Sequence, residues 1–152
     1  MLKTFSFLIV LLIAAPGADA ETSYRQAVEA AASDDYQNAL DHFESALMAE
    51  PNNLQYGSEY RQLVIKTKSY DRSIAFFEKL VESHPEAGNA FLNFGFAYVD
   101  WIPDAGAITQ VINANTALSY FTKSIELEPT WIGYYTRGNS YLYWPKIFNR
   151  TH

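Results

Sequence analysis

The amino-acid sequence predicts an all-α fold in which antiparallel pairs of helices repeat along the chain. Landmark residues recur at one spacing, apolar side chains follow a helical period, and turn residues end each period. The landmarks that stand 34 residues apart are Tyr36 and Tyr70, Phe43 and Phe77, and Pro51 and Pro85. A period of about 34 residues is typical of helix–turn–helix units that stack into a solenoid.

Residues 1–20 have the layout of a secretory signal peptide. A positive charge precedes an apolar run over residues 5–15, Pro16-Gly17 follow it, and small residues stand at Ala18 and Ala20. The alternative, an uncleaved membrane anchor, needs about 20 apolar residues, whereas this run has eleven. We therefore expect cleavage after Ala20, export to the periplasm or the cell exterior, and a repeat domain over residues 21–152.

Residues 21–53 form the first predicted unit. Between Tyr36 and Leu47 apolar groups recur every three or four residues, which is the stripe of an amphipathic helix. Glu50-Pro51 and two asparagines end this helix, because proline cannot continue it and asparagine suits a turn.

The second and third units are predicted over residues 54–87 and 88–131. The third unit has a stride of 44 residues, so it carries ten additional residues, which we assign to an insertion at 101–113. Pro103 and Gly106 are expected to break the first helix there, with one extra turn following them. The insertion is either a tolerated surface segment or a binding loop. We favour a surface segment whose apolar side packs against the array.

A partial fourth unit is predicted over residues 132–152. Its first helix begins near Tyr134, and no second helix follows Pro145 within this sequence. The aromatic side chains of this helix would therefore face nothing, and an apolar patch of this kind marks an interface or a missing segment. We expect a shortened array or an end that docks a partner, self-association included.

The chain from about residue 21 to 144 resembles the tetratricopeptide repeat (TPR) family. The third unit matches the family pattern at Phe91, Phe94-Gly95, Tyr98, Ala117, Phe121 and Pro129, and the fourth at Tyr134, Gly138 and Tyr141. The second unit departs from it, because Arg61 and Ser73 stand where small residues are usual. The resemblance implies a right-handed α-solenoid in which the two helices of the second unit lie slightly apart.

The composition offers little for catalysis. There is no cysteine, the net charge is −6, and the three histidines are far apart in the sequence. These facts argue against thiolate chemistry, a histidine metal site and a nucleic-acid partner. We expect no enzymatic activity, no cofactor and no metal.

The resemblance implies a binding groove along the first helix of each repeat. Transferred onto this sequence, the groove residues are Tyr24, Val28, Gln62, Asn89, Leu92, Asn93, Phe96, Tyr135 and Asn139. Members that clamp a terminal carboxylate carry lysine and arginine at several such sites, whereas this chain has Glu59 and asparagines there, so no clamp is expected. Amides and rings suit an extended peptide. The alternative is that these residues only pack or hydrate.

The sequence therefore predicts an exported scaffold module that binds a peptide or protein segment without catalysis. Two alternatives stay open: the repeat portion of a longer extracytoplasmic enzyme, and a self-associating structural module. Residues 21–56 hold seven acidic side chains and one basic one. This first unit is expected to act as a solubilising cap or to attract a basic partner.

Overall fold

The computed structural model describes residues 16–143, and the side chains from 19 to 142. The described chain folds as seven α-helices: α1 (Pro16–Ala32), α2 (Tyr36–Ala49), α3 (Leu54–Thr67), α4 (Tyr70–Ser83), α5 (Gly88–Trp101), α6 (Ala107–Leu127) and α7 (Trp131–Tyr143). A short 3₁₀ turn, η1 (Ile102–Asp104), lies between α5 and α6. The prediction of an all-helical solenoid is confirmed.

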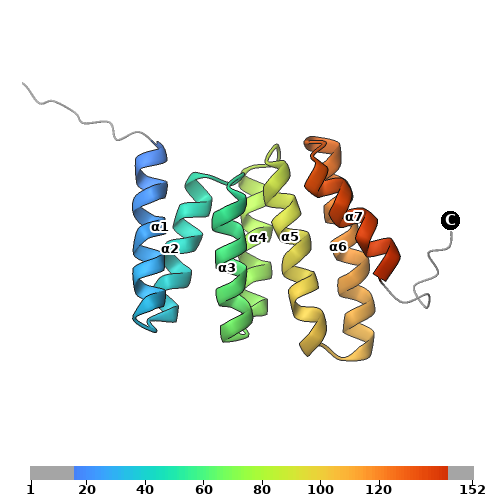
Figure 1. Cartoon of the computed structure of the whole chain (residues 1–152), viewed down its shortest axis with the longest axis horizontal. Helices are drawn as coiled ribbons and strands as arrows, with labels where there is room; N and C mark the ends of the chain where they lie inside the picture. Colours follow the sequence, from blue (N-terminus) through green and yellow to red (C-terminus); the bar gives the residue numbers. More distant parts are fainter. Residues whose placement is uncertain (1–15, 144–152) are drawn as a thin grey trace, which may run out of the picture.

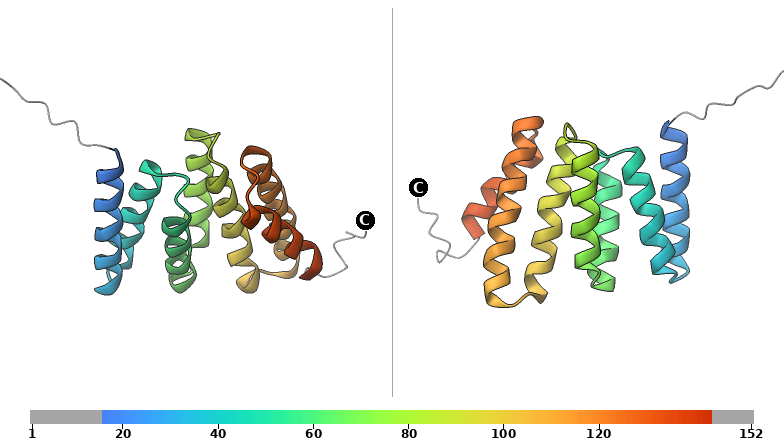
Figure 2. Two further views of the ribbon diagram at one scale, coloured as in Figure 1. Left: turned by 45° about the horizontal axis from the view of Figure 1, so that its top comes forward. Right: turned by 180° about the vertical axis from the view of Figure 1, so that it is seen from behind.

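The helices stack in chain order as antiparallel neighbours (Figure 1). The first helices of the units, α1, α3, α5 and α7, form one side of the array, which we call the first-helix face. The second helices, α2, α4 and α6, form the opposite side, as the view from behind shows (Figure 2). No helix in the described part is long and apolar enough to span a membrane.

Helix α1 begins at Pro16, upstream of the expected start of the domain. Proline is accepted in the first turn of a helix because its missing N–H would have no intrahelical partner there. Pro16 and Gly17 therefore lie in the first described turn of α1. Ala20 is fully buried in the main core, so the expected cleavage site lies inside α1. Cleavage itself stays a prediction.

The turns between helices use the residues that the sequence pattern indicated. Asn53 caps α3, since its side-chain oxygen accepts a hydrogen bond from the Tyr56 N–H at 3.1 Å. The two helix pairs α1–α2 and α3–α4 are closed by Asp34 and Lys68, which adopt left-handed backbone angles with φ of 60° and 57°. These short connections place successive helices antiparallel.

Small residues allow the first and third helix pairs to pack along their whole length. In the first pair Ala27 and Ala39 are completely buried, and Phe43 fills the space beside them. In the third pair Gly95 lies against Phe121, where a Cβ would approach the ring to 2.4 Å. The close approach of α5 and α6 therefore depends on glycine at this position.

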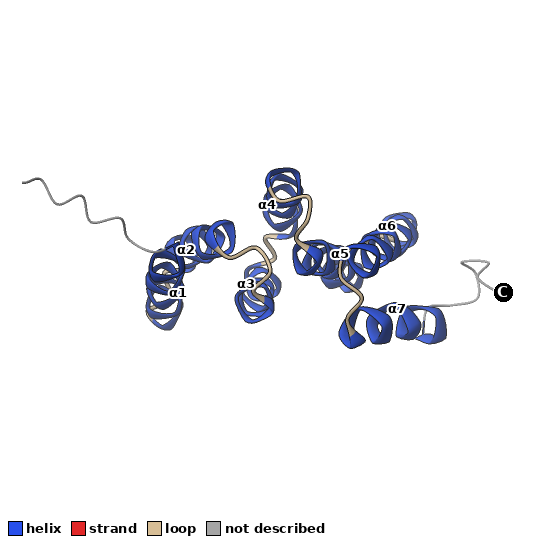
Figure 3. Cartoon of the chain, turned by 90° about the horizontal axis from the view of Figure 1, so that it is seen from above, coloured by secondary structure: helices blue, strands red, loops and turns tan. Residues whose placement is uncertain are grey.

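The two helices of the second pair lie apart, as predicted from Arg61 and Ser73. The backbones of α3 and α4 approach each other less closely than those of α1–α2 and α5–α6, and the Tyr60 ring of α3 reaches Phe76 and Phe77 across the wider space (Figure 3). Arg61 occupies the position that Ala27 and Gly95 hold in the neighbouring units, and its long side chain crosses to α5 instead. Since α3 has less contact with its own partner, it packs against α2 and α5.

The insertion forms the 3₁₀ turn and the first turns of α6, which begins at Ala107. One side of it is anchored to the array: Trp101 stacks on Tyr70 with ring centroids 6.2 Å apart, and the Tyr70 hydroxyl donates to Asp104 at 2.9 Å. The expectation that its apolar side packs down is only partly right, because Ile108 and Ile112 are 79% and 57% exposed. Ile108 and Ile112 stand four residues apart, so they share one exposed side of α6.

Candidate binding groove

An N-terminal cleft of ≈ 530 Å³ opens between α1 and α3 on the first-helix face. Val28 and Gln62, both predicted groove residues, lie at this cleft. Its other lining residues are Ala31, Tyr36, Phe43, Glu59, Leu63 and Lys66. The cleft therefore combines an apolar floor with one carboxylate, one amide and one ammonium group.

Tyr24 stands beside this cleft and joins α1 to α3. Its ring stacks on Tyr56 with centroids 4.5 Å apart, and its hydroxyl donates to Glu59 Oε1 at 3.0 Å. The Gln55 amide donates to the same hydroxyl at 2.9 Å. Burial, followed by the bond to Glu59, raises the pKa of Tyr24. Tyr24 therefore positions the Glu59 carboxylate, which sequence reasoning had assigned only as a groove side chain.

The neighbouring Tyr56 is also tied to α1. Its hydroxyl donates to Glu21 Oε2 at 3.2 Å. Burial, with this hydrogen bond as the next cause, raises the pKa of Tyr56 to about 12. Both tyrosines therefore stay neutral hydrogen-bond donors at physiological pH, and neither has the properties of a general base.

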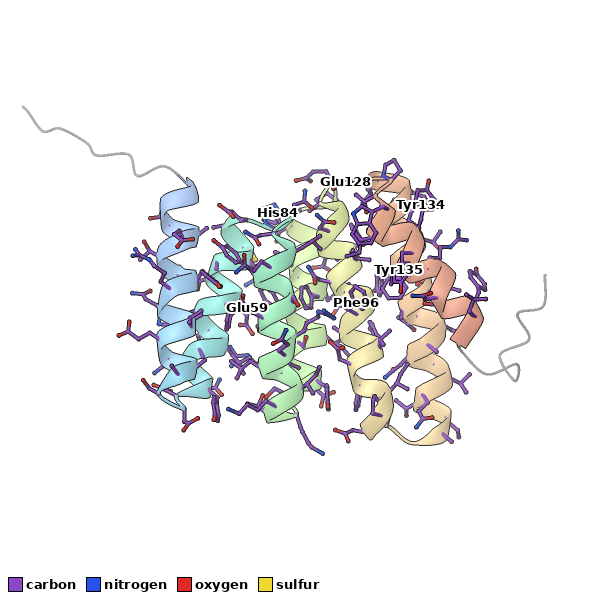
Figure 4. All side chains as sticks on the ribbon, viewed as in Figure 1. Glu59, His84, Phe96, Glu128, Tyr134 and Tyr135 are labelled. Atoms are coloured by element: carbon purple, nitrogen blue, oxygen red, sulfur yellow. The ribbon has the colours of Figure 1, made fainter. Side chains whose placement is uncertain are left out.

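A smaller C-terminal cleft of ≈ 250 Å³ lies where α5, α6 and α7 meet. Three predicted groove residues, Phe96, Tyr135 and Asn139, come together here. The remaining lining residues are Val99, Phe121, Thr136 and Ser140. Figure 4 shows Glu59, Phe96 and Tyr135 on the same side of the molecule, so both clefts open on the first-helix face. This cleft is mainly aromatic, with hydroxyl and amide groups on α7.

Arg61 belongs to α3, which lines the N-terminal cleft, and its side chain contacts Phe96 of the C-terminal cleft. Its guanidinium lies 4.5 Å from the centroid of the Phe96 ring and 3.2 Å from the Asp100 carboxylate. Both charged side chains are about 85% buried, at 14% and 15% exposure. Burial lowers the pKa of Arg61 and raises that of Asp100, in each case against the opposing effect of the partner charge. Sequence reasoning had seen Arg61 only as an obstacle to packing.

Two predicted groove residues are buried, and a third, the half-buried Asn89, is hydrogen-bonded to a neighbouring turn. Leu92 is fully buried beside Ala117 and Phe121. Asn93 is 2% exposed and lies against Gly57 of α3. Asn89 is used internally, since its backbone N–H donates to Asn52 Oδ1 and its amide donates to the Asn52 carbonyl, both at 3.0 Å.

The physical reason for the burial of Asn93 is the position of α3. A Cβ at Gly57 would meet the Asn93 amide at 2.2 Å, so the glycine lets α3 approach α5 and cover this part of it. The Asn93 Nδ2 has no hydrogen-bond partner within the described residues. The part of α5 that stays accessible is the next turn, which carries Phe96 and Val99.

The acidity of the first unit is partly neutralised by basic side chains of the second unit. Arg72 of α4 bonds to Glu44 at 2.7 Å and also pairs with Asp41. Asp34 lies 3.9 Å from Lys66. The charge available to attract a basic partner is therefore smaller than the composition of residues 21–56 suggests. Residues 16–143 contain no group of three or more His, Asp or Glu side chains arranged to hold a metal.

An array of stacked helix pairs with clefts along one side defines the class of helical-repeat proteins. A family model described as tetratricopeptide repeat matches residues 30–93. Residues 30–93 are therefore tetratricopeptide repeats, and the helix pairs beyond them continue the same repeat geometry.

Two curated relatives carry the name photosystem I assembly protein Ycf3. The protein from Prochlorococcus marinus subsp. pastoris is 31% identical over 78 residues, which are 49% of this chain and 45% of that protein. The one from a Synechococcus strain is 26% identical over 127 residues, or 79% of this chain and 73% of that protein. The chain thus spans less than half the length of the first of these relatives.

Solved structures share the fold. MamA of Desulfovibrio magneticus RS-1 superposes with a TM-score of 0.52 at 22% identity, over 82% of this chain and 65% of that one. The N-terminal domain of stress-induced protein-1 from C. elegans has the same TM-score at 16% identity, over 84% and 98% of the two chains. At these identities the likeness concerns the fold alone.

Proposed function

We propose that this protein is a non-catalytic scaffold that holds an extended segment of another protein along its first-helix face. The observation that carries the proposal is the placement of two clefts on one face, at α1–α3 and at α5–α7. Proteins of the tetratricopeptide repeat family bind protein partners, and a solenoid offers them a rigid surface.

The two clefts favour different parts of the bound segment. The C-terminal cleft is lined by Phe96, Phe121 and Tyr135, so it suits an apolar or aromatic side chain. The N-terminal cleft offers Glu59, Gln62 and Lys66, so it suits backbone amides and polar side chains. We therefore expect a segment with a bulky apolar anchor at one end and a polar stretch beside it.

The names of the relatives support an assembly role. Two of them are called assembly proteins, and the chain matches one over 73% of its length. A scaffold that holds a segment of a subunit while a larger complex forms would require only the surfaces described above. The identity of such a complex does not follow from these names.

The proposal is tested by selecting ligands from a phage-displayed library of random 12-residue peptides. Peptides that bind the protein are then measured against Tyr135→Ser and Asn139→Ala, two changes on the accessible side of α7, and against Ile108→Ser on the outer turn of α6 as the matched control. We expect each cleft change to weaken binding about tenfold and the control to leave it unchanged. Selected peptides that bind all three variants equally would place the binding site elsewhere.

We further propose that the protein is exported, as the layout of residues 1–20 suggests. The test is intact mass spectrometry of the protein purified from its source. A mass corresponding to residues 21–152 would support export with cleavage after Ala20. The mass of the uncleaved chain would contradict it.

A further inference from the structure

The last described helix has lost the contact that its counterpart one repeat earlier makes. Gly95 of α5 and Gly138 of α7 stand 43 residues apart at equivalent positions of their units. At Gly95 a Cβ would lie 2.4 Å from the Phe121 ring of α6, whereas at Gly138 no atom of the described residues comes within 4 Å. The same glycine is therefore covered by a helix in the third unit and open in the fourth.

The aromatic neighbours of the two glycines repeat this contrast. Phe91, one turn before Gly95, is 9% exposed, while its counterpart Tyr134 is 56% exposed. Tyr141, on the following turn, is 44% exposed. On its opposite side α7 packs against α6, where Gly133 lies close to Ile125. Tyr134, Gly138 and Tyr141 thus form a continuous surface that we call the open face of α7; Figure 4 shows Tyr134 at this end of the array.

The second helices α2, α4 and α6 indicate which side chains pack on the face of a first helix. Each carries a small residue followed by phenylalanine four positions later: Ala39 and Phe43, Ser73 and Phe77, and Ala117 and Phe121. These side chains are all at most 3% exposed. In the third unit the pair sits on Gly95, so a helix with the same small–x–x–x–Phe spacing fits the open glycine of α7.

One residue of α7, which differs from its counterpart in α5, indicates that the docked helix needs a negative charge. Arg137 stands where α5 has Phe94, which stacks on Tyr120 of α6 with centroids 4.1 Å apart. Tyr120 lies three positions after Ala117, so the residue at that place in a docked helix would face Arg137. The half-buried Arg137 side chain places its guanidinium 5.7 Å from the centroid of the Tyr141 ring, on the open face. A carboxylate at this place in the docked helix would accept hydrogen bonds from the guanidinium.

We propose that the open face of α7 binds an amphipathic helix of a partner protein, with a small residue on Gly138, a carboxylate three positions later and phenylalanine four positions later. The docked helix would complete the fourth unit in the way that α6 completes the third. This surface is distinct from the two clefts, so the proposal does not depend on peptide binding there.

The probe is a fluorescein-labelled synthetic peptide of residues 107–128 that carries Tyr120→Glu, measured by fluorescence anisotropy with the 152-residue protein. It reproduces the helix that sits on Gly95 and adds the carboxylate for Arg137. We expect it to bind, and we expect Gly138→Leu to weaken binding at least about tenfold because the leucine would occupy the contact site. Gly106→Leu is the matched control, since a Cβ at Gly106 also meets nothing within 4 Å.

Two peptide variants test the required side chains. Phe121→Ala in the peptide is expected to abolish binding, and lysine in place of glutamate at position 120 to weaken it about threefold or more. Circular dichroism of Gly138→Leu checks that the variant folds, as expected where there is open space.

Three results would overturn the proposal. The first is a peptide that does not bind. The second is binding that Gly138→Leu leaves intact, which would mean that the peptide displaces α6 or enters a cleft. The third is a dimer of the protein itself that Gly138→Leu dissociates while the peptide stays unbound, which would make a second copy the occupant.

Discussion

At the scale of single residues, two glycines at equivalent positions have opposite environments. Gly95 permits contact between helices, whereas Gly138 leaves a space that no described atom fills. A glycine inside a helix lowers stability, because folding costs it more conformational entropy than other residues. A close helix contact that only glycine permits can offset this loss. The cost at Gly95 is offset by the packing of α5 on α6, and at Gly138 nothing in the described chain offsets it.

We predict opposite effects of alanine at these two positions. Gly95→Ala should lower the free energy of unfolding by about 1–3 kcal/mol, because the methyl group meets Phe121. Gly138→Ala should raise it by about 0.5–1 kcal/mol, because only helix propensity changes. Urea denaturation followed by circular dichroism measures both. A loss of stability in Gly138→Ala would show that something already covers the open face.

A second residue-scale prediction concerns the anchor of the insertion. The Tyr70 hydroxyl bond, followed by Lys68 at 3.2 Å, lowers the pKa of the exposed Asp104 carboxyl below its ordinary value of 3.8. Because the folded-state pKa is depressed, the ionised carboxylate stabilises the fold above pH 3.8, and this contribution is lost as the pH falls through the lower folded value.

The measurement is a carbon-detected NMR titration of Asp104. We expect Tyr70→Phe to move the pKa of Asp104 up toward 3.8, and by more than Lys68→Ala does, since the hydroxyl bond is the larger cause. A pKa at or above 3.8 in the unsubstituted protein, or one that Tyr70→Phe leaves in place, would contradict the anchor as described.

At the scale of the elements, the second helix pair differs from its neighbours. Arg61 replaces a small contact residue, reaches α5 and forms an ion pair with Asp100 while covering the Phe96 ring. Removing two charges from water is costly, and their attraction repays the cost only when the pair is complete. The arrangement of α3 against α5 therefore depends on both partners.

We predict that Asp100→Leu lowers the free energy of unfolding by about 3 kcal/mol, because it leaves the Arg61 charge buried without a counter-charge. The double variant Arg61→Met with Asp100→Leu should recover most of that loss, since neither charge remains to be desolvated. A double-mutant cycle by urea denaturation tests this. Additive effects of the two single changes would show that the pair is not coupled.

At the scale of the whole molecule, the two ends of the described array differ. The first helix is packed into the main core, whereas the last helix leaves one of its sides uncovered by described residues. At the beginning, α1 extends to Pro16 and buries Ala20 in the same core that holds Phe43 and Leu47. At the other end of the described chain, α7 packs on α6, while no described atom lies within 4 Å of a Cβ at Gly138. The N-terminal boundary therefore bears on stability, and the open face of α7 is where we propose that a partner helix binds.

We predict that a chain beginning at Glu21 is less stable than one beginning at Pro16. The loss should be about 1 kcal/mol, because the shorter chain lacks the buried methyl group of Ala20 and the first turn of α1. Thermal denaturation of the two purified chains at equal concentration gives the difference. Equal midpoints would mean that residues 16–20 add nothing to the fold.

The sequence by itself determined the repeat unit, the turns and the sites of close helix contact. These follow from local chemistry that recurs at a fixed spacing: Pro51 and Pro85 end helices, and Ala39 and Gly95 permit close packing. It also predicted the separation of the second pair, because Arg61 cannot fit where a small residue belongs. Phe96, Tyr135 and Asn139 were predicted as groove residues from the family resemblance, and the structure brings them together at the C-terminal cleft.

Only the tertiary structure decided which groove residues are accessible. Leu92 and Asn93 occupy the predicted register but are covered, because Leu92 packs against Ala117 and Phe121 of α6 and Asn93 lies against Gly57 of α3. The exposure of a side chain depends on how one unit tilts on the next, and a repeat pattern specifies each unit rather than the angle between units. For the same reason, the pairing of Arg61 with Asp100 became evident only from the packed helices.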